Sequence, residues 1–300
     1  MASGTPTNRT NYEIPNDVAS EIIQKTQESS AIMQLARKIA LPGNGLQIPM
    51  ITGDPTPAWV AETGVKPVSN PTISKKVMQG HKLAVIVPFS DEFRRDLKSL
   101  YDALVARLPG VLAKKFDETV YFGPASGSLA NFDNFASITG ISLQTSVYGG
   151  LVTADTNISE AGGMINGYVF SPQGRGMLLS ALDGDNRPLF INNVSEGAIP
   201  RILGAPTHFT SAAYKAGAAA VGSDAAVPDV VGFAGDWTKA MYGIVQGVNI
   251  TTSTEATLQV GTDSVINLFQ QNMFAVRAEI EIGFVAETDY FNKLTRTHSA

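Results

Sequence analysis

Residues 46–88 read LQIPMITGDPTPAWVAETGVKPVSNPTISKKVMQGHKLAVIVP, and this stretch decides the fold. Its two ends carry the apolar pattern of strands, whereas the middle is rich in proline, which excludes a helix and restricts strand pairing to edges and bends. A loop of this length is uncommon in a compact domain and is usually functional. The stretch therefore predicts an extended β-hairpin that reaches away from the body of the protein.

A long helix is expected directly after this hairpin. Ser90 is a suitable N-cap, because Asp91 and Glu92 follow it in the first turn. Apolar residues then keep a helical spacing as far as Phe122, and Gly-Pro ends the pattern. Pro109 lies inside this helix and is expected to break or kink it.

The segment before the hairpin is expected to begin as an extended arm. Residues 1 to about 17 are polar and aperiodic. A helix is expected from Asn16 or Asp17 toward Thr26, and a second short helical stripe over 32–39.

The second half of the chain predicts another lobe and a return to the first. Residues 141–230 alternate short helices and strands, and Ser171 is the expected N-cap of one of these helices. The stretch MFAVRAEIEIGFVAE (273–287) alternates apolar and mostly polar residues, as in a strand with one buried face. The early helix and this late strand are expected to pack together, so the first lobe is discontinuous in sequence.

Composition excludes several functions. The chain has 300 residues, 16% of them charged, a net charge of −5 and no cysteine. Disulfides, thiolate metal sites and a cysteine nucleophile are therefore excluded. The absence of a dense basic run argues against tight direct binding to DNA. A signal peptide and an apolar run long enough to span a membrane are both missing, which predicts a soluble, non-secreted protein without a membrane partner.

No motif predicts a catalytic, cofactor or metal site. The chain contains no P-loop, dinucleotide-binding glycine motif, H-E-x-x-H or G-x-S-x-G. The histidines at 81, 208 and 298 are far apart in sequence, so they do not prepare a metal site. Asp183, Asp185 and Asn186 lack the later glycine and glutamate of a calcium loop and predict an ordinary turn.

Four stretches in order carry a family resemblance: AETGVKP (61–67), VPFSDEF (87–93), GFAGDWTKAMYGIVQGVNI (232–250) and NMFAVRAEIEIGFVAE (272–287). Together they span nearly the whole chain. With the order of elements above, the sequence resembles the major capsid proteins of tailed bacteriophages, which have the Hong Kong 97 fold.

The resemblance implies an α+β fold in four parts. These are an N-terminal arm (1–45), an extended β-hairpin loop (46–88), a peripheral domain with a long spine helix (89–140 and 231–300) and an axial domain (141–230). It also implies a structural function rather than an enzymatic one. Copies would assemble into hexamers and pentamers of an icosahedral head that encloses double-stranded DNA without binding it tightly.

The implied partners are further copies of the chain, a portal, a scaffolding protein and decoration proteins. No helical scaffold segment precedes the arm, so with Met1 as the native start, scaffolding would be a separate protein or dispensable. The implied location is the virion, after assembly in the host cytoplasm.

The resemblance also indicates three residues for a covalent crosslink. Some relatives join a loop lysine to an asparagine of a neighbour with the help of a glutamate, and the matching positions are Lys66, Asn272 and Glu279. A carboxylate in an apolar pocket can take a proton from the attacking amine. The alternative is that these side chains make ordinary salt bridges and turn contacts.

Two other functions remain open on the sequence. A cellular encapsulin shell shares the fold but holds protein cargo, and the long arm and loop argue against it. A two-lobed soluble hydrolase would be a monomer or dimer with a polar cleft.

Overall fold

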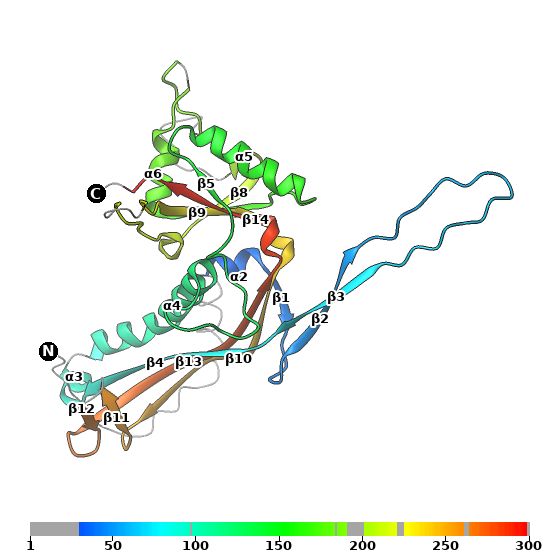
Figure 1. The fold of residues 1–300 in the computed structure, drawn as a ribbon. Coiled ribbons are helices and arrows are strands. Elements are labelled where there is room, and N and C mark those ends of the chain that lie inside the picture. Colours follow the sequence, from blue (N-terminus) through cyan, green and yellow to red (C-terminus); the bar gives the residue numbers. More distant parts are fainter. Residues whose placement is uncertain are drawn as a thin grey trace.

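The computed structural model describes residues 30–96, 98–183, 185–190, 201–220, 225–260 and 264–298. Figure 1 shows an elongated lobe built on long strands, a second lobe at one end of it, and a thin hairpin projecting to the side. The helix expected from Asn16 or Asp17 lies outside the described residues.

The helices are α2 (Ala31–Leu35), α3 (Asp91–Asp96), α4 (Lys98–Phe122), α5 (Val147–Glu160) and α6 (Pro172–Ser180), with short 3-10 helices η1 (Ser211–Ala213), η2 (Trp237–Lys239) and η3 (Thr288–Tyr290). The strands are β1 (Arg37–Ala40), β2 (Leu46–Gly53), β3 (Thr72–Met78), β4 (His81–Ser90), β5 (Gly140–Ser142), β6 (Gly167–Phe170), β7 (Arg201–Ile202), β8 (Ala205–Phe209), β9 (Asp229–Gly235), β10 (Ala240–Ser253), β11 (Thr257–Val260), β12 (Ser264–Asn267), β13 (Met273–Ala286) and β14 (Phe291–Arg296).

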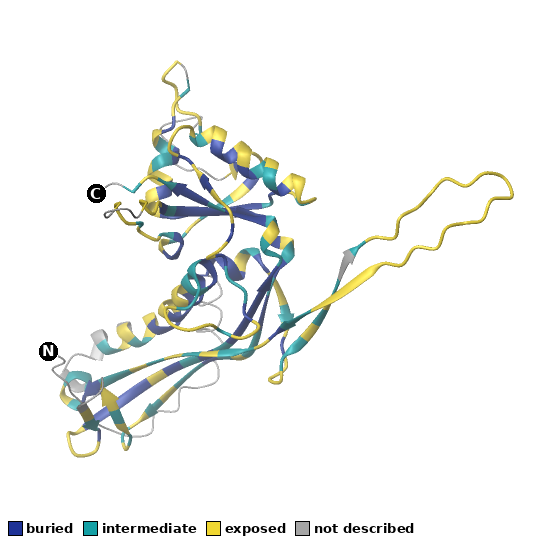
Figure 2. Ribbon diagram, in the orientation of Figure 1, coloured by how far each residue is buried: buried dark blue, intermediate teal, exposed yellow. Residues whose placement is uncertain are grey.

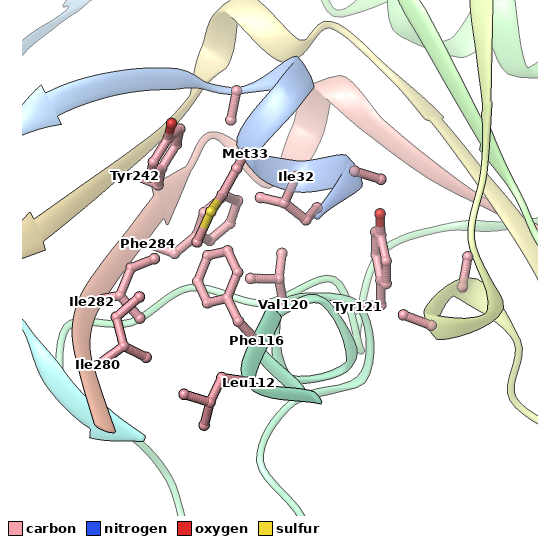
Figure 3. Packing of buried hydrophobic residues seen from close by; sticks show 14 of the residues in the cluster. Ile32, Met33, Leu112, Phe116, Val120, Tyr121, Tyr242, Ile280, Ile282 and Phe284 are labelled. Carbon is pink, nitrogen blue, oxygen red and sulfur yellow. The ribbon is translucent and has the colours of Figure 1, made fainter. Parts of the chain in front are cut away.

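The elongated lobe is a four-stranded sheet in the order β1-β10-β13-β4, with α4 lying along it. One face of β13 is buried, as its alternation predicts, and its members are Phe274, Val276, Ala278, Ile280, Ile282 and Phe284. The Phe116 ring of α4 meets the Phe284 ring edge to face, with centroids 6.3 Å apart. Figure 3 shows this packing together with Leu112 and Val120. The expected packing of the early helix on the late strand is thus confirmed.

The helix α4 runs through Pro109 without a break, so of the two expected outcomes, a break or a kink, the break is wrong. Proline removes one backbone donor, but buried contacts on both sides hold the helix against the sheet. Leu108 and Leu112 are both buried in the main core. The helix ends where expected, because Gly123 adopts a positive φ of 79° and donates its N–H to the carbonyl of Thr119 at 2.9 Å.

The helical stripe expected over 32–39 is only partly helical. Helix α2 ends at Leu35, and Ile39 lies in β1, which pairs in parallel with β10. Pairing with β10 satisfies backbone groups of residues 37–40 in the sheet, so tertiary context overrides the local pattern.

The projecting hairpin consists of β2 and β3, which pair only with each other. Residues 54–71 continue from them without helix or strand and are exposed throughout (Figure 2). Strand β4, which the sequence joined to the hairpin, pairs instead with β13 along the elongated lobe. The hairpin proper therefore ends at Met78.

The second lobe is a six-stranded sheet in the order β5-β14-β9-β6-β8-β7. Ser171 caps α6 as expected, with its hydroxyl accepting from the Gly174 N–H at 3.1 Å. The sheet also contains β9 and β14, so strands encoded beyond residue 230 complete this lobe. Strand β5, where the chain enters the second lobe, thereby pairs with β14, the last of the described strands.

Candidate functional site

The extended hairpin exposes large apolar side chains that have no core of their own. Trp59 is 105% exposed, Val65 94% and Val68 92%. A folded protein rarely leaves such a group in water unless it is an interaction site, and tryptophan is among the residues that contribute most to protein interfaces. The hairpin is therefore a surface suited to burial against another protein.

The root of the hairpin has a small apolar cluster. Leu41, Met78 and Val285 are buried together there, and Leu46 and Ile48 of β2 pack against them. This cluster joins the hairpin to the end of β13. Apolar contact of this kind holds the hairpin in place but is not directional.

The three crosslink candidates do not meet within one chain. Lys66 is exposed on the projecting hairpin. Asn272 is exposed immediately before β13, and Glu279 is seven residues further on, about 23 Å along a strand at 3.3 Å per residue. The Glu279 carboxylate lies 3.4 Å from the Arg277 guanidinium. In a single chain it therefore sits beside a cation and not in the apolar pocket that the expected chemistry requires.

The other polar residues noted in the sequence have local structural partners. Asp183 accepts hydrogen bonds from the backbone N–H groups of Asp185 and Arg187, which confirms an ordinary turn. Within the described part of the chain, no three histidine, aspartate or glutamate side chains gather as metal ligands. No described helix is both long and apolar enough to cross a membrane.

Sequence reasoning missed a buried carboxylate in the long helix. Asp117 accepts a hydrogen bond from the Ser30 hydroxyl and a second from the Ala31 N–H at 2.9 Å, so it caps the first turn of α2. Burial raises the pKa of Asp117 to about 7, although these hydrogen bonds lower it. The available signal was its position one helical turn from Ala113 and from Tyr121, both of which face the core.

A second buried carboxylate holds the end of the chain. Asp229 accepts from Arg296 Nε at 2.9 Å, from His298 Nδ1 at 2.6 Å and from the Gly217 N–H at 2.8 Å. Burial alone would raise the pKa of Asp229, but the hydrogen bonds from Gly217, His298 and Arg296 lower it to about 2. The carboxylate thus fastens β14 to β9.

The long helix on a four-stranded sheet, the second lobe and the projecting hairpin together define a capsid fold. The chain superimposes on a structure from Gordonia phage Cozz with a TM-score of 0.73 at 18% identity, covering 90% of this chain and 87% of that chain. It also superimposes on the capsid of the native GTA particle with a TM-score of 0.66 at 13% identity, covering 98% and 94%.

A match to the phage capsid family spans residues 10–294, and the chain belongs to this family. It is 27% identical over 296 residues to the probable major capsid protein gp17 of Mycobacterium phage L5, covering 92% of this chain and 87% of that protein. It is 24% identical over 292 residues to the major capsid protein of Staphylococcus phage 80alpha, covering 93% and 83%. The family is one of structural proteins and not of enzymes, and the encapsulin and hydrolase alternatives are not favoured.

Proposed function

We propose that this chain is the major capsid protein of a tailed phage, and that its copies assemble as hexamers and pentamers into an icosahedral head around double-stranded DNA. Membership of the phage capsid family over residues 10–294 carries this proposal. The exposed hairpin supports it, because a subunit that is complete only beside its neighbours must carry such surfaces.

The proposed division of labour follows the Hong Kong 97 pattern. The expected arm, residues 1–45, ends with α2 and β1, which belong to the core and sheet of the peripheral domain, and the extended loop is the hairpin that begins at Leu46 and ends at Met78. The peripheral domain is the four-stranded sheet with α4 as spine helix. The axial domain is the six-stranded sheet, which takes β9 and β14 in addition to strands from 141–230. The axial domains would surround the five-fold and six-fold axes.

The extended loop would lie over a neighbouring copy and bury its apolar side chains there. A tryptophan side chain buries about 150–250 Å². At about 25 cal/mol per Å², burial of Trp59 alone would contribute at most about 4–6 kcal/mol to the contact. Trp59 would therefore be a main apolar contributor to the contact between a loop and its neighbour.

The proposed partners extend beyond copies of the chain. A portal, a scaffolding protein and decoration proteins would join the shell, which would assemble in the host cytoplasm and become part of the virion. The net charge of −5 fits a shell that encloses DNA without binding it tightly.

Purification of the expressed chain tests the assembly proposal. Light scattering is expected to detect capsomers or particles in the megadalton range, and electron micrographs are expected to show closed shells. A chain that stays monomeric or dimeric at all concentrations, and remains so with its phage's scaffolding protein, would contradict the proposal.

A covalent crosslink between copies is a second, separate proposal. The Lys66 amine would attack the side-chain carbonyl carbon of Asn272 on a neighbour. Glu279 of a neighbour would take a proton from the attacking amine and pass it to the amide nitrogen, so that the C–N bond of the amide breaks, ammonia leaves and an isopeptide bond remains. The exposure of both Lys66 and Asn272 supports it. Mature particles are expected to give a ladder on denaturing gels that Lys66→Arg abolishes, whereas monomer bands alone would refute the crosslink.

A further inference from the structure

A short segment after the long helix holds the root of the extended loop. We call residues 130–133 the bracket. Lys76 of β3 places its Nζ 2.7 Å from Asp133 Oδ2 and donates to the carbonyl of Ala286 at 2.6 Å. The same Asp133 oxygen accepts from the Ala286 N–H at 2.9 Å. One lysine and one carboxylate thus tie β3 to the end of β13.

The bracket also contacts the turn between β3 and β4. The Gln79 N–H donates to the carbonyl of Asn131 at 3.4 Å. His81 Nε2 lies 2.8 Å from the carbonyl oxygen of Ala130, so this nitrogen carries the proton and donates. The bracket therefore contacts the root of the loop at Lys76, Gln79 and His81.

The core of the elongated lobe fixes the position of the bracket. Phe132 is 9% exposed, and its ring meets Phe116 of α4 at 6.4 Å and Phe284 of β13 at 6.1 Å. The Asp133 N–H donates to the carbonyl of Phe284 at 3.2 Å. Because the bracket is packed against both α4 and β13, it cannot move with the loop independently of them.

The polar contacts of the bracket can fix the direction of the loop, which the apolar cluster at the root cannot. A two-stranded hairpin is marginally stable alone, and apolar contact does not set its direction. Hydrogen bonds to charged groups are short and directional. The Lys76 and Asp133 side chains are 31% and 25% exposed, so water screens their pair less than it screens a surface salt bridge.

We propose that the Lys76–Asp133 pair on the bracket sets the angle at which the extended loop leaves the lobe, and thereby the angle between neighbouring copies in the shell. In this proposal Lys76 is a positioning residue that acts through its contacts within the chain. This inference deepens the proposed function and rests on it: a loop that varies in direction would place neighbours at varying angles, and shells would vary in size.

Lys76→Met, compared with Lys75→Met, tests the proposal. Lys75 is the adjacent lysine of β3 and is exposed, so its loss removes the same charge without touching the bracket. In unassembled protein, Lys76→Met is expected to speed hydrogen exchange of the β2–β3 amides by about tenfold or more, because it removes both the pair with Asp133 and the hydrogen bond to the Ala286 carbonyl. Assembled Lys76→Met shells are expected to have a broader range of diameters in electron micrographs. Lys76→Arg should restore both readouts, because it keeps a cationic donor.

Equal exchange rates and equal diameters for the two methionine variants would overturn the proposal. Asp133→Asn provides a second variant in case Lys76→Met fails to fold, because it keeps an acceptor for the Ala286 N–H and removes only the charge. Failure of the wild-type chain to form shells would count against the proposed function alone, since hydrogen exchange tests the bracket without assembly.

Discussion

The Asp117 carboxylate accepts a hydrogen bond from the hydroxyl of Ser30, a residue 87 positions earlier in the chain. The long helix thereby caps the short helix that precedes the four-stranded sheet. A buried carboxylate at such a junction makes the attachment of the chain's first described residues sensitive to pH.

The pKa of Asp117 predicts the direction of this pH dependence. Its folded pKa of about 7 lies above the ordinary value of 3.8, so the folded chain binds a proton that the unfolded chain releases. The stabilisation is fully present below pH 3.8 and is lost as the pH rises through about 7. Asp117→Asn keeps the size of the side chain and removes the titratable group, so it should remove this dependence. Urea unfolding of unassembled protein at pH 5 and pH 8 measures the change in unfolding free energy between the two pH values. The same change in the Asp117→Asn variant would contradict the assignment to Asp117.

Asp229 is expected to contribute stability with the opposite pH dependence. Its folded pKa of about 2 lies below 3.8, so its contribution is present above pH 3.8 and is lost as the pH falls through about 2. Asp229→Ala leaves Arg296 without its buried partner and should lower the free energy of unfolding by about 3–5 kcal/mol. The matched control is Asp185→Ala, whose pair with Arg187 is 71–73% exposed and should contribute less than about 1 kcal/mol. Similar losses in both variants would rule out a special role for Asp229.

The two tryptophans are expected to behave oppositely. Trp59→Ala should leave the unfolding free energy of the unassembled chain unchanged and prevent or weaken assembly, because this side chain is fully exposed. Trp237→Ala should cost about 3–5 kcal/mol of stability, because the ring is 1% exposed and its Nε1–H donates to the Gly167 carbonyl at 3.0 Å. Chemical unfolding and light scattering on the same samples separate the two effects. Normal shells from the Trp59 variant would show that this residue is not the loop's anchor.

Gly110 in the long helix offers a stabilising substitution. An added Cβ at Gly110 meets nothing within 4 Å, so Gly110→Ala should raise the free energy of unfolding by about 0.5–1 kcal/mol through helix propensity. Gly150→Ala in α5 is the contrasting control, because its Cβ would lie 2.6 Å from Leu143 Cδ2 and should destabilise the chain. Thermal unfolding of both variants measures the difference, and two shifts of the same sign would contradict this account.

The sequence predicted the elements whose signals are local. Ser171 caps α6 where expected, with its hydroxyl accepting at 3.1 Å, because side-chain capping needs only residues a few positions apart. Ser90 also caps a helix, accepting from the Phe93 N–H at 3.0 Å, but that helix is the short α3 (Asp91–Asp96) and not the long α4 (Lys98–Phe122) that the sequence predicted to begin there. The alternation of β13 likewise identified its buried face. These features depend on neighbours in the chain, which the sequence displays directly.

Features that depend on distant partners could not be predicted in this way. Residues 37–40 form a strand only because β10 offers an open edge, and Pro109 remains in a helix only because its neighbours are buried. The roles of Asp117 and Asp229 depend on the backbone N–H groups beside them, which come from distant parts of the fold and are not visible in the sequence. In the proposed shell, the partners of Lys66 and Trp59 would belong to other copies, so a single chain could not reveal them.

The place of β14 in the second sheet has a consequence for the timing of synthesis. This strand lies between β5 and β9 and hydrogen-bonds to both. A ribosome makes residues 291–296 long after residues 140–142, so β5 waits without this partner strand until residues 291–296 have been made. A chain therefore cannot complete the sheet of its second lobe before β14 has been made.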